Sequence, residues 1–336
     1  MSRNFINPAD NDEFIKLRGL DLQELIVQVE NYLLEYRNIL GLPQNLTFGV
    51  EIEYEGIMRK ITDKFIEKKL PNWHSKGDGS LSSGGEITSP VMKDELKYWQ
   101  ELKMVCEHLT KRNADTLHNS GGHIHIGTCI LGEDIEAWRN FLKLYTIYEH
   151  ILFRFIYGDK ISARKKLYKY APPVADTLYE SLEEINGAED MDDLRYALPT
   201  SERYAALNFC NVRFYDPNEN YDKNTIEFRS PNATTDAIIW QNNINAFAKM
   251  LVSSKQKVMD EEFLDYKLRK DYMEYSTNRY LYDNVNIRDV LEFVDLVFDN
   301  NLDKIYFLRQ YLKDFQDGYG LKTAVRAKKF VKIRWN

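Results

Sequence analysis

The sequence FGVEIEYEG, residues 48–56, alternates apolar and acidic side chains. Successive side chains of a β-strand point to opposite faces, so this pattern predicts a strand over residues 47–56 with one apolar and one acidic face. Glu51 and Glu53 share the acidic face, about 7 Å apart along the strand. The apolar face predicts burial against a core, whereas paired carboxylates on the other face indicate a functional site.

Two later stretches have the same period. His123 and His125 share one face of GGHIHIG, and Glu227 and Arg229 share one face of TIEFRSP, while the residues between them are strongly apolar. For any one pair, a simply solvated sheet face is an equally good explanation. Such faces usually mix Thr, Lys and Gln, however, so the three pairs together predict one shared polar site.

Convergence of these strands would bring several carboxylates within a few ångströms of one another. Their mutual repulsion raises pKa values unless cations neutralise them. Carboxylate oxygens, assisted by an imidazole, are ligands suited to Mg²⁺ or Mn²⁺. The glycine-rich stretch KGDGSLSSGGEITSP adds a further carboxylate, Glu86. Asp78 and Ser80 in this stretch either orient water or substrate, or are ordinary turn residues.

The remaining periodicity predicts an α+β fold around an antiparallel sheet. Further strands are expected at 206–215 and 225–230, and helices at 21–40, 63–69, 95–111, 137–157 and from 235 onward. We expect an N-terminal helical segment (1–45), a catalytic core (46–250) and a C-terminal helical region with a basic tail (251–336). Within the core, residues 158–200 are either an insertion that forms a lid over the site or a solvated loop-and-helix insertion.

Composition narrows the class of protein further. The net charge of −7 argues against a general nucleic-acid binder, which usually has a basic surface. We find neither a signal-like apolar segment nor a stretch of about 18 apolar residues, so a cytoplasmic protein without a membrane partner is expected. The scattered cysteines Cys106, Cys129 and Cys210 fit a reducing compartment and have no zinc-site spacing.

Taken in order, the motifs FGVEIEYEG, DGSLSSGGEITSP, GGHIHIG, RYAALN and NTIEFRSPN resemble the amidoligase family. That family belongs to the carboxylate–amine ligases, which are similar to glutamine synthetase and glutamate–cysteine ligase. The resemblance covers roughly residues 48–248. It implies a twisted antiparallel sheet that forms a funnel flanked by helices, with ATP entering one end and a carboxylate and an amine substrate the other.

The resemblance also implies roles for individual residues. Its metal ligands would be Glu51, Glu53, Glu86, Glu227 and one or both of His123 and His125. Arg229 resembles the arginine that meets the transferred phosphate or the substrate carboxylate, and Arg203 resembles a second phosphate-contacting arginine. The predicted nucleotide-binding residues are therefore Arg229, Arg203, Asn208 and Ser80.

The predicted function is an ATP-dependent carboxylate–amine ligase that forms an amide or isopeptide bond. A carboxylate is a poor electrophile, and ATP can activate it as an acyl phosphate if metal ions and an arginine reduce the repulsion between anions. A phosphotransferase of guanidino-kinase-like fold and an inactive ligase-fold binding module are the alternatives. The substrates (amino acid, peptide or protein-linked), the general base and the oligomeric state stay open.

Overall fold

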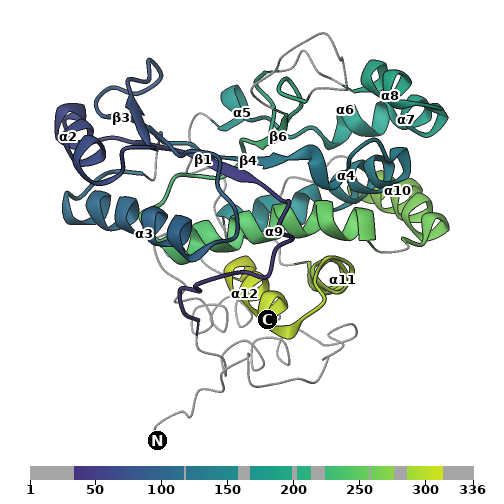
Figure 1. Ribbon diagram of the computed structural model, residues 1–336. Coiled ribbons are helices and arrows are strands. Elements are labelled where there is room, and N and C mark those ends of the chain that lie inside the picture. Colours follow the sequence, from purple (N-terminus) through teal and green to yellow (C-terminus); the bar gives the residue numbers. More distant parts are fainter. Residues whose placement is uncertain are drawn as a thin grey trace, which may run out of the picture.

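The computed structural model describes residues 34–116, 119–157, 167–198, 203–212, 224–256, 259–275 and 286–312 (Figure 1). Its centre is a six-stranded sheet with the order β2-β3-β1-β4-β6-β5, in which all neighbouring strands are antiparallel. The strands are β1 (Phe48–Tyr54), β2 (His74–Lys76), β3 (Gly85–Thr88), β4 (Gly122–Gly127), β5 (Leu207–Asn208) and β6 (Thr225–Phe228). The mixture of helices with an antiparallel sheet confirms the α+β class.

Helices account for most of the remaining described chain. Along the sequence they are α2 (Arg59–Lys69), α3 (Leu96–Lys111), the 3₁₀ turn η2 (Thr128–Ile130), α4 (Ile135–Tyr157), α5 (Leu167–Tyr170), α6 (Ala175–Glu180), α7 (Leu182–Gly187), α8 (Met191–Ala197), α9 (Ala237–Gln256), α10 (Glu261–Tyr275), α11 (Ile287–Val297) and α12 (Asn301–Tyr311). Figure 1 shows α3 and α9 beneath the sheet, with α11 and α12 as a further layer beyond α9. None of the described helices is long and apolar enough to span a membrane.

The core lies between these helices and the apolar face of the sheet. Phe48 of β1 stacks on Trp99 of α3 with 5.0 Å between ring centroids. Phe228 of β6 stacks on Phe247 of α9 at 4.0 Å and also meets the edge of Phe141 from α4. Large rings such as these contribute much of the apolar area that a core removes from water. One face of each strand therefore packs against the core, and the opposite face points toward the site.

The strands predicted around FGVEIEYEG, GGHIHIG and TIEFRSP are all present, although shorter than expected. The strand expected at 206–215 is reduced to β5 within the described residues, and 213–215 lie outside them. The Asn208 side-chain oxygen accepts a hydrogen bond from the Cys210 amide at 2.8 Å. This local contact turns the chain away from the sheet.

The helix predicted at 21–40 is wrong in its described part. Residues 34–40 are not helical, and 21–33 lie outside the described residues, as does the basic tail. Backbone groups of this segment bond to distant side chains instead of to one another. The Arg37 amide donates to Gln241 at 2.9 Å, and the Leu40 amide donates to Asp94 at 2.8 Å. These tertiary contacts replace the helical hydrogen bonds that the apolar periodicity predicts.

Candidate active site

Strand register places the polar side chains of the three motifs on one face of the sheet. Residues directly opposite each other in antiparallel strands share a face. The opposed pairs are Lys76 with Glu86, Glu86 with Glu53, Glu51 with His123, His125 with Glu227, and Glu227 with Asn208. A polar stripe therefore crosses all six strands, from Lys76 on the β2 edge to Asn208 on the β5 edge.

All ten site residues predicted from the sequence line one cavity of about 810 Å³ above this stripe. They are Glu51, Glu53, Ser80, Glu86, His123, His125, Arg203, Asn208, Glu227 and Arg229. The two strands missed by the prediction, β2 and β3, complete the cavity by bringing Glu86 against β1. The structure thus brings together residues that are up to 178 positions apart, from Glu51 to Arg229.

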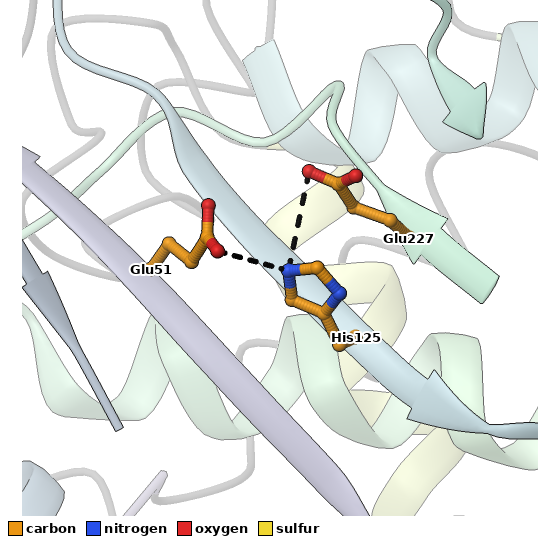
Figure 2. Close-up of side chains that lie close together, drawn as sticks. All are labelled: Glu51, His125 and Glu227. Carbon is orange, nitrogen blue, oxygen red and sulfur yellow. Dashed lines mark ion pairs between the residues drawn. The ribbon is translucent and has the colours of Figure 1, made fainter. Parts of the chain in front are cut away.

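One group of three side chains has the donor atoms of a metal site. Ligand atoms of Glu51, His125 and Glu227 lie within 4.8 Å of one another. Figure 2 shows both carboxylates turned toward the His125 ring, whose Nε2 lies 3.3 Å from Glu51 Oε1 and 3.9 Å from Glu227 Oε1. This Nε2 is buried and has no hydrogen-bond partner among the described residues. A buried imidazole nitrogen that faces two carboxylates fits a divalent cation.

A second group lies further along the stripe. Ligand atoms of Glu53, Asp78 and Glu86 also lie within 4.8 Å of one another. We did not predict Asp78 as a ligand, because aspartate in a glycine-rich turn is usually a turn residue. Its side-chain oxygen does accept a hydrogen bond from the Ser80 amide at 2.6 Å, as a turn residue would. The spacing of Asp78 eight positions before Glu86 is the only trace of this group in the sequence.

His123 lies between the two groups. Its Nδ1 is 3.1 Å from Glu51 Oε2 and 3.6 Å from Glu227 Oε1, and its Nε2 is 3.8 Å from Glu53 Oε1. The sequence leaves open which histidine faces a metal. His125 belongs to the first donor group, whereas His123 lies among three carboxylates.

Glu227 is the most heavily bonded carboxylate of the site. Arg229 Nη1 donates to Glu227 Oε1 at 2.5 Å, and Asn208 Nδ2 donates to Glu227 Oε2 at 2.7 Å. Arg229 Nε also points to the Tyr170 carbonyl at 3.4 Å. These contacts fix the guanidinium of Arg229 on the cavity wall, beside the first carboxylate group.

Aromatic side chains that sequence reasoning missed form the wall around the arginines. Tyr170 and Tyr204 meet edge to face at 5.7 Å. The guanidinium carbon of Arg203 lies 5.7 Å from the centre of the Tyr204 ring, and that of Arg229 lies 6.0 Å from it. Such distances permit cation–π attraction. Among 22 tyrosines, no local pattern distinguishes these two.

The third glutamate of FGVEIEYEG anchors the loop that carries Asp78. Glu55 Oε1 accepts hydrogen bonds from the backbone amide and the hydroxyl of Ser82, both at 2.7 Å, and Glu55 Oε2 accepts one from Asn119 at 2.9 Å. Gly84 adopts a φ of +106°, and a Cβ there would lie 2.0 Å from the Tyr54 carbonyl oxygen. The loop therefore packs directly on the end of β1.

Negative charge is distributed unevenly along the stripe. Burial alone would raise the pKa of Glu51, but the neighbouring imidazoles of His123 and His125 outweigh it and hold that pKa well below its usual range. Burial raises the pKa of Glu86, and the charge of Glu51 raises it further, against the opposing effect of Lys76. Imidazoles therefore offset the charge of Glu51, whereas Lys76 only partly offsets the burial and the like charge that act on Glu86.

A second hollow of about 420 Å³ adjoins the cavity and shares Glu51 and His125 with it. Gly49 and Gly127, which have no side chains, line it together with Thr88 and Thr225. The first donor group therefore stands at the junction of two spaces, one mainly polar with two arginines and one formed largely by backbone and small side chains.

Comparison with protein families adds independent information. The model of the family described as "Putative amidoligase enzyme" matches residues 61–251, more than half of the 336-residue chain. This range contains every predicted site residue except Glu51 and Glu53. No curated protein matches the chain. The extent of the family match and the motif order agree, and the chain belongs to the amidoligase family.

Proposed function

We propose that this protein is an ATP-dependent carboxylate–amine ligase whose divalent metal ions bind on the polar face of the sheet. Membership of the amidoligase family supports an amide-forming ligase in general. The observation that carries the finer proposal is the pair of donor groups in one cavity, with Arg229 bonded to a carboxylate of the first group.

The proposal assigns each donor group a metal ion. Glu51, His125 and Glu227 would hold one ion. Glu53, Asp78 and Glu86 would hold the other. When bound, Mg²⁺ or Mn²⁺ would neutralise the charge of a nucleotide triphosphate and so permit attack by an anion. His125 supports this assignment, because its Nδ1 contacts Thr225 Oγ1 at 3.4 Å, and the tautomer with hydrogen on Nδ1 turns the lone pair of Nε2 toward the cation.

The arginines would offset the negative charge of the reacting groups. In the first step a carboxylate oxygen of the substrate attacks the γ-phosphorus of ATP, the bond to the β-phosphate oxygen breaks, and an acyl phosphate and ADP form. In the second step the amine attacks the acyl carbon and loses a proton to a base in the cavity. The bond from the acyl carbon to the phosphate oxygen breaks, and inorganic phosphate leaves. Arg229 is held by Glu227 and the Tyr170 carbonyl, so it is already oriented toward developing phosphate charge.

The two adjoining spaces suggest how the reactants are arranged. The second hollow, which Gly49 and Gly127 line beside the first donor group, would take the base and ribose of a nucleotide. The polar cavity with Arg203 and Tyr204 then remains for the carboxylate and amine substrates. This arrangement corresponds to the glutamine-synthetase-like funnel that the resemblance implies, with nucleotide and substrates entering from different ends.

The test is ADP release with Mg²⁺ and a panel of carboxylates and amines, followed by mass spectrometry of the products. We expect amide formation that depends on substrate and is lost in Glu51→Gln and Glu227→Gln. Glu67→Gln, an exposed position on α2 away from the cavity, is the matched control and should retain full activity. Failure of nucleotide to bind with Mg²⁺ across the panel would contradict the proposal. A phosphorylated small molecule without any amide would instead identify a phosphotransferase.

A further inference from the structure

Lys76 reaches from the edge of the sheet into the second carboxylate group. It is the last residue of β2, directly opposite Glu86 of β3, and it lines the cavity. Its Nζ lies 2.9 Å from Glu86 Oε1. The lysine side chain is 57% exposed, whereas that of Glu86 is only 5% exposed. A largely exposed lysine therefore neutralises a buried carboxylate.

The carboxylate that Lys76 contacts also belongs to the donor group of Glu53, Asp78 and Glu86. Among the described residues, Lys76 is the only lysine or arginine that forms an ion pair with any of these three side chains. Arg229, the other ion-paired cation of the cavity wall, is bound to Glu227 in the first group. The two groups therefore differ: the first adds an imidazole to its two carboxylates, whereas the second contains only carboxylates, one of which is already paired with an ammonium.

We propose that Lys76 is the built-in counter-cation of the second group, holding Glu86 until a divalent ion displaces its ammonium. This inference rests on the proposed function, because it presupposes divalent ions at these carboxylates. An ion at the second group must compete with the tethered ammonium for Glu86, whereas an ion at the first group meets Arg229 on Glu227 but gains the imidazole nitrogen of His125. The two ions consequently bind in order, the second one more weakly.

Displacement also delivers a positive charge to the cavity. The freed ammonium stays on β2 at the cavity wall, where it can donate a hydrogen bond to a phosphate group of a bound nucleotide. The second ion and the anion therefore assist each other, since the anion offers the ammonium a new partner. Lys76 acts in this way as a positioning residue that links the filling of the second metal site to the arrival of nucleotide.

The experiment measures Mn²⁺ binding to the full chain by electron paramagnetic resonance and calorimetry, without nucleotide. We expect Lys76→Gln to strengthen the second, weaker step by about threefold to tenfold and to leave the first step within about twofold. Lys76→Arg should behave like the wild type, because it keeps the charge. Lys93→Gln, an exposed lysine outside the cavity, removes the same charge and should change neither step.

Further variants make each result decisive. Adding Asp78→Asn to Lys76→Gln should abolish the strengthened step and so assign it to the second group. The inference is overturned if Lys76→Gln leaves the second step unchanged or weaker, or if it strengthens both steps equally, while the wild type still binds Mn²⁺. If neither wild type nor variant binds Mn²⁺, the proposed function fails together with the inference. Thermal unfolding without metal should show a lower midpoint for Lys76→Gln than for Lys93→Gln, since only Lys76 neutralises a buried carboxylate.

Discussion

Glu51 and His123 are directly opposite each other in β1 and β4, and His123 Nδ1 lies 3.1 Å from Glu51 Oε2. The other oxygen of Glu51 faces His125 Nε2 at 3.3 Å. Glu51 is thus shared between two imidazoles with different surroundings. One imidazole lies among the carboxylates of both donor groups, and the other points an unbonded nitrogen at a single group.

This difference predicts unequal effects of replacing the two histidines. His125→Asn should weaken the first Mn²⁺ binding step by at least about tenfold, because it removes a ligand nitrogen. His123→Asn should have a smaller effect, since it removes a charge neighbour and not a ligand. Calorimetric titration with Mn²⁺ compares them directly. A greater loss in His123→Asn than in His125→Asn would show that the ligand has been assigned to the wrong histidine.

Two glycines of the same loop should respond differently to a methyl group. Gly84→Ala would force a Cβ to 2.0 Å from the Tyr54 carbonyl oxygen at a φ of +106°, so we expect a loss of about 2–4 kcal/mol in the free energy of unfolding. Gly79 has no atom within 4 Å of such a Cβ, and Gly79→Ala should change stability by less than about 0.5 kcal/mol. Urea unfolding measures both, and equal losses would contradict the packing of the loop on β1.

Tyr204 should matter through its ring rather than its hydroxyl. Its ring lies beside the guanidinium groups of Arg203 and Arg229, in the part of the cavity that we propose for the substrates. Tyr204→Leu should therefore raise the KM for the carboxylate substrate severalfold, with a smaller effect on kcat, whereas Tyr204→Phe should stay close to the wild type. Steady-state kinetics of ADP release measure both. If Tyr204→Phe is as impaired as Tyr204→Leu, the hydroxyl and not the ring makes the contact.

Outside the site, Asp289 predicts a pH dependence of stability. Burial alone would raise the pKa of Asp289, but hydrogen bonds and charges from His150 and Lys267 outweigh it and lower the pKa to about 2. A lowered pKa means that the ionised form stabilises the fold. This contribution, about 2 kcal/mol, is fully present above about pH 4 and is lost as the pH falls toward 2.

The check is urea unfolding of the wild type and Asp289→Asn between pH 5 and 2. The variant should be less stable at pH 5, because Lys267 loses a buried partner, and its stability should fall less steeply below pH 4. Asp192→Asn, an exposed position on α8, should follow the wild-type curve. Parallel curves for Asp289→Asn and the wild type would show that Asp289 does not titrate as described.

Much of the sheet could be predicted because β1, β4 and β6 combine a strict period of two with side chains of opposite character. A shift of one residue would place Glu51 or His123 in the core, so the pattern determines the faces. The predicted set of ten cavity residues depends on this constraint together with the family resemblance. Neither needs knowledge of the helices.

Other parts of the site depend on contacts that local sequence does not contain. β2 and β3 are three and four residues long and flank a glycine-rich turn, so their period is too short to recognise. Lys76 and Asp78 reach the site only because β2 pairs with β3, and β3 in turn pairs with β1. The helix predicted through residue 40 is replaced by bonds to Asp94 and Gln241, which are distant in sequence.

The central claim is that the two donor groups and Arg229 support amide formation through an acyl phosphate. The most direct measurement supplies carboxylate substrates labelled with oxygen-18, together with ATP, Mg²⁺ and amines, and follows the label by mass spectrometry. We predict one labelled oxygen in the released phosphate, an amide product in equal amount, and neither in Glu227→Gln. Amide formed with only unlabelled phosphate, or ADP formed without any amide, would contradict this mechanism.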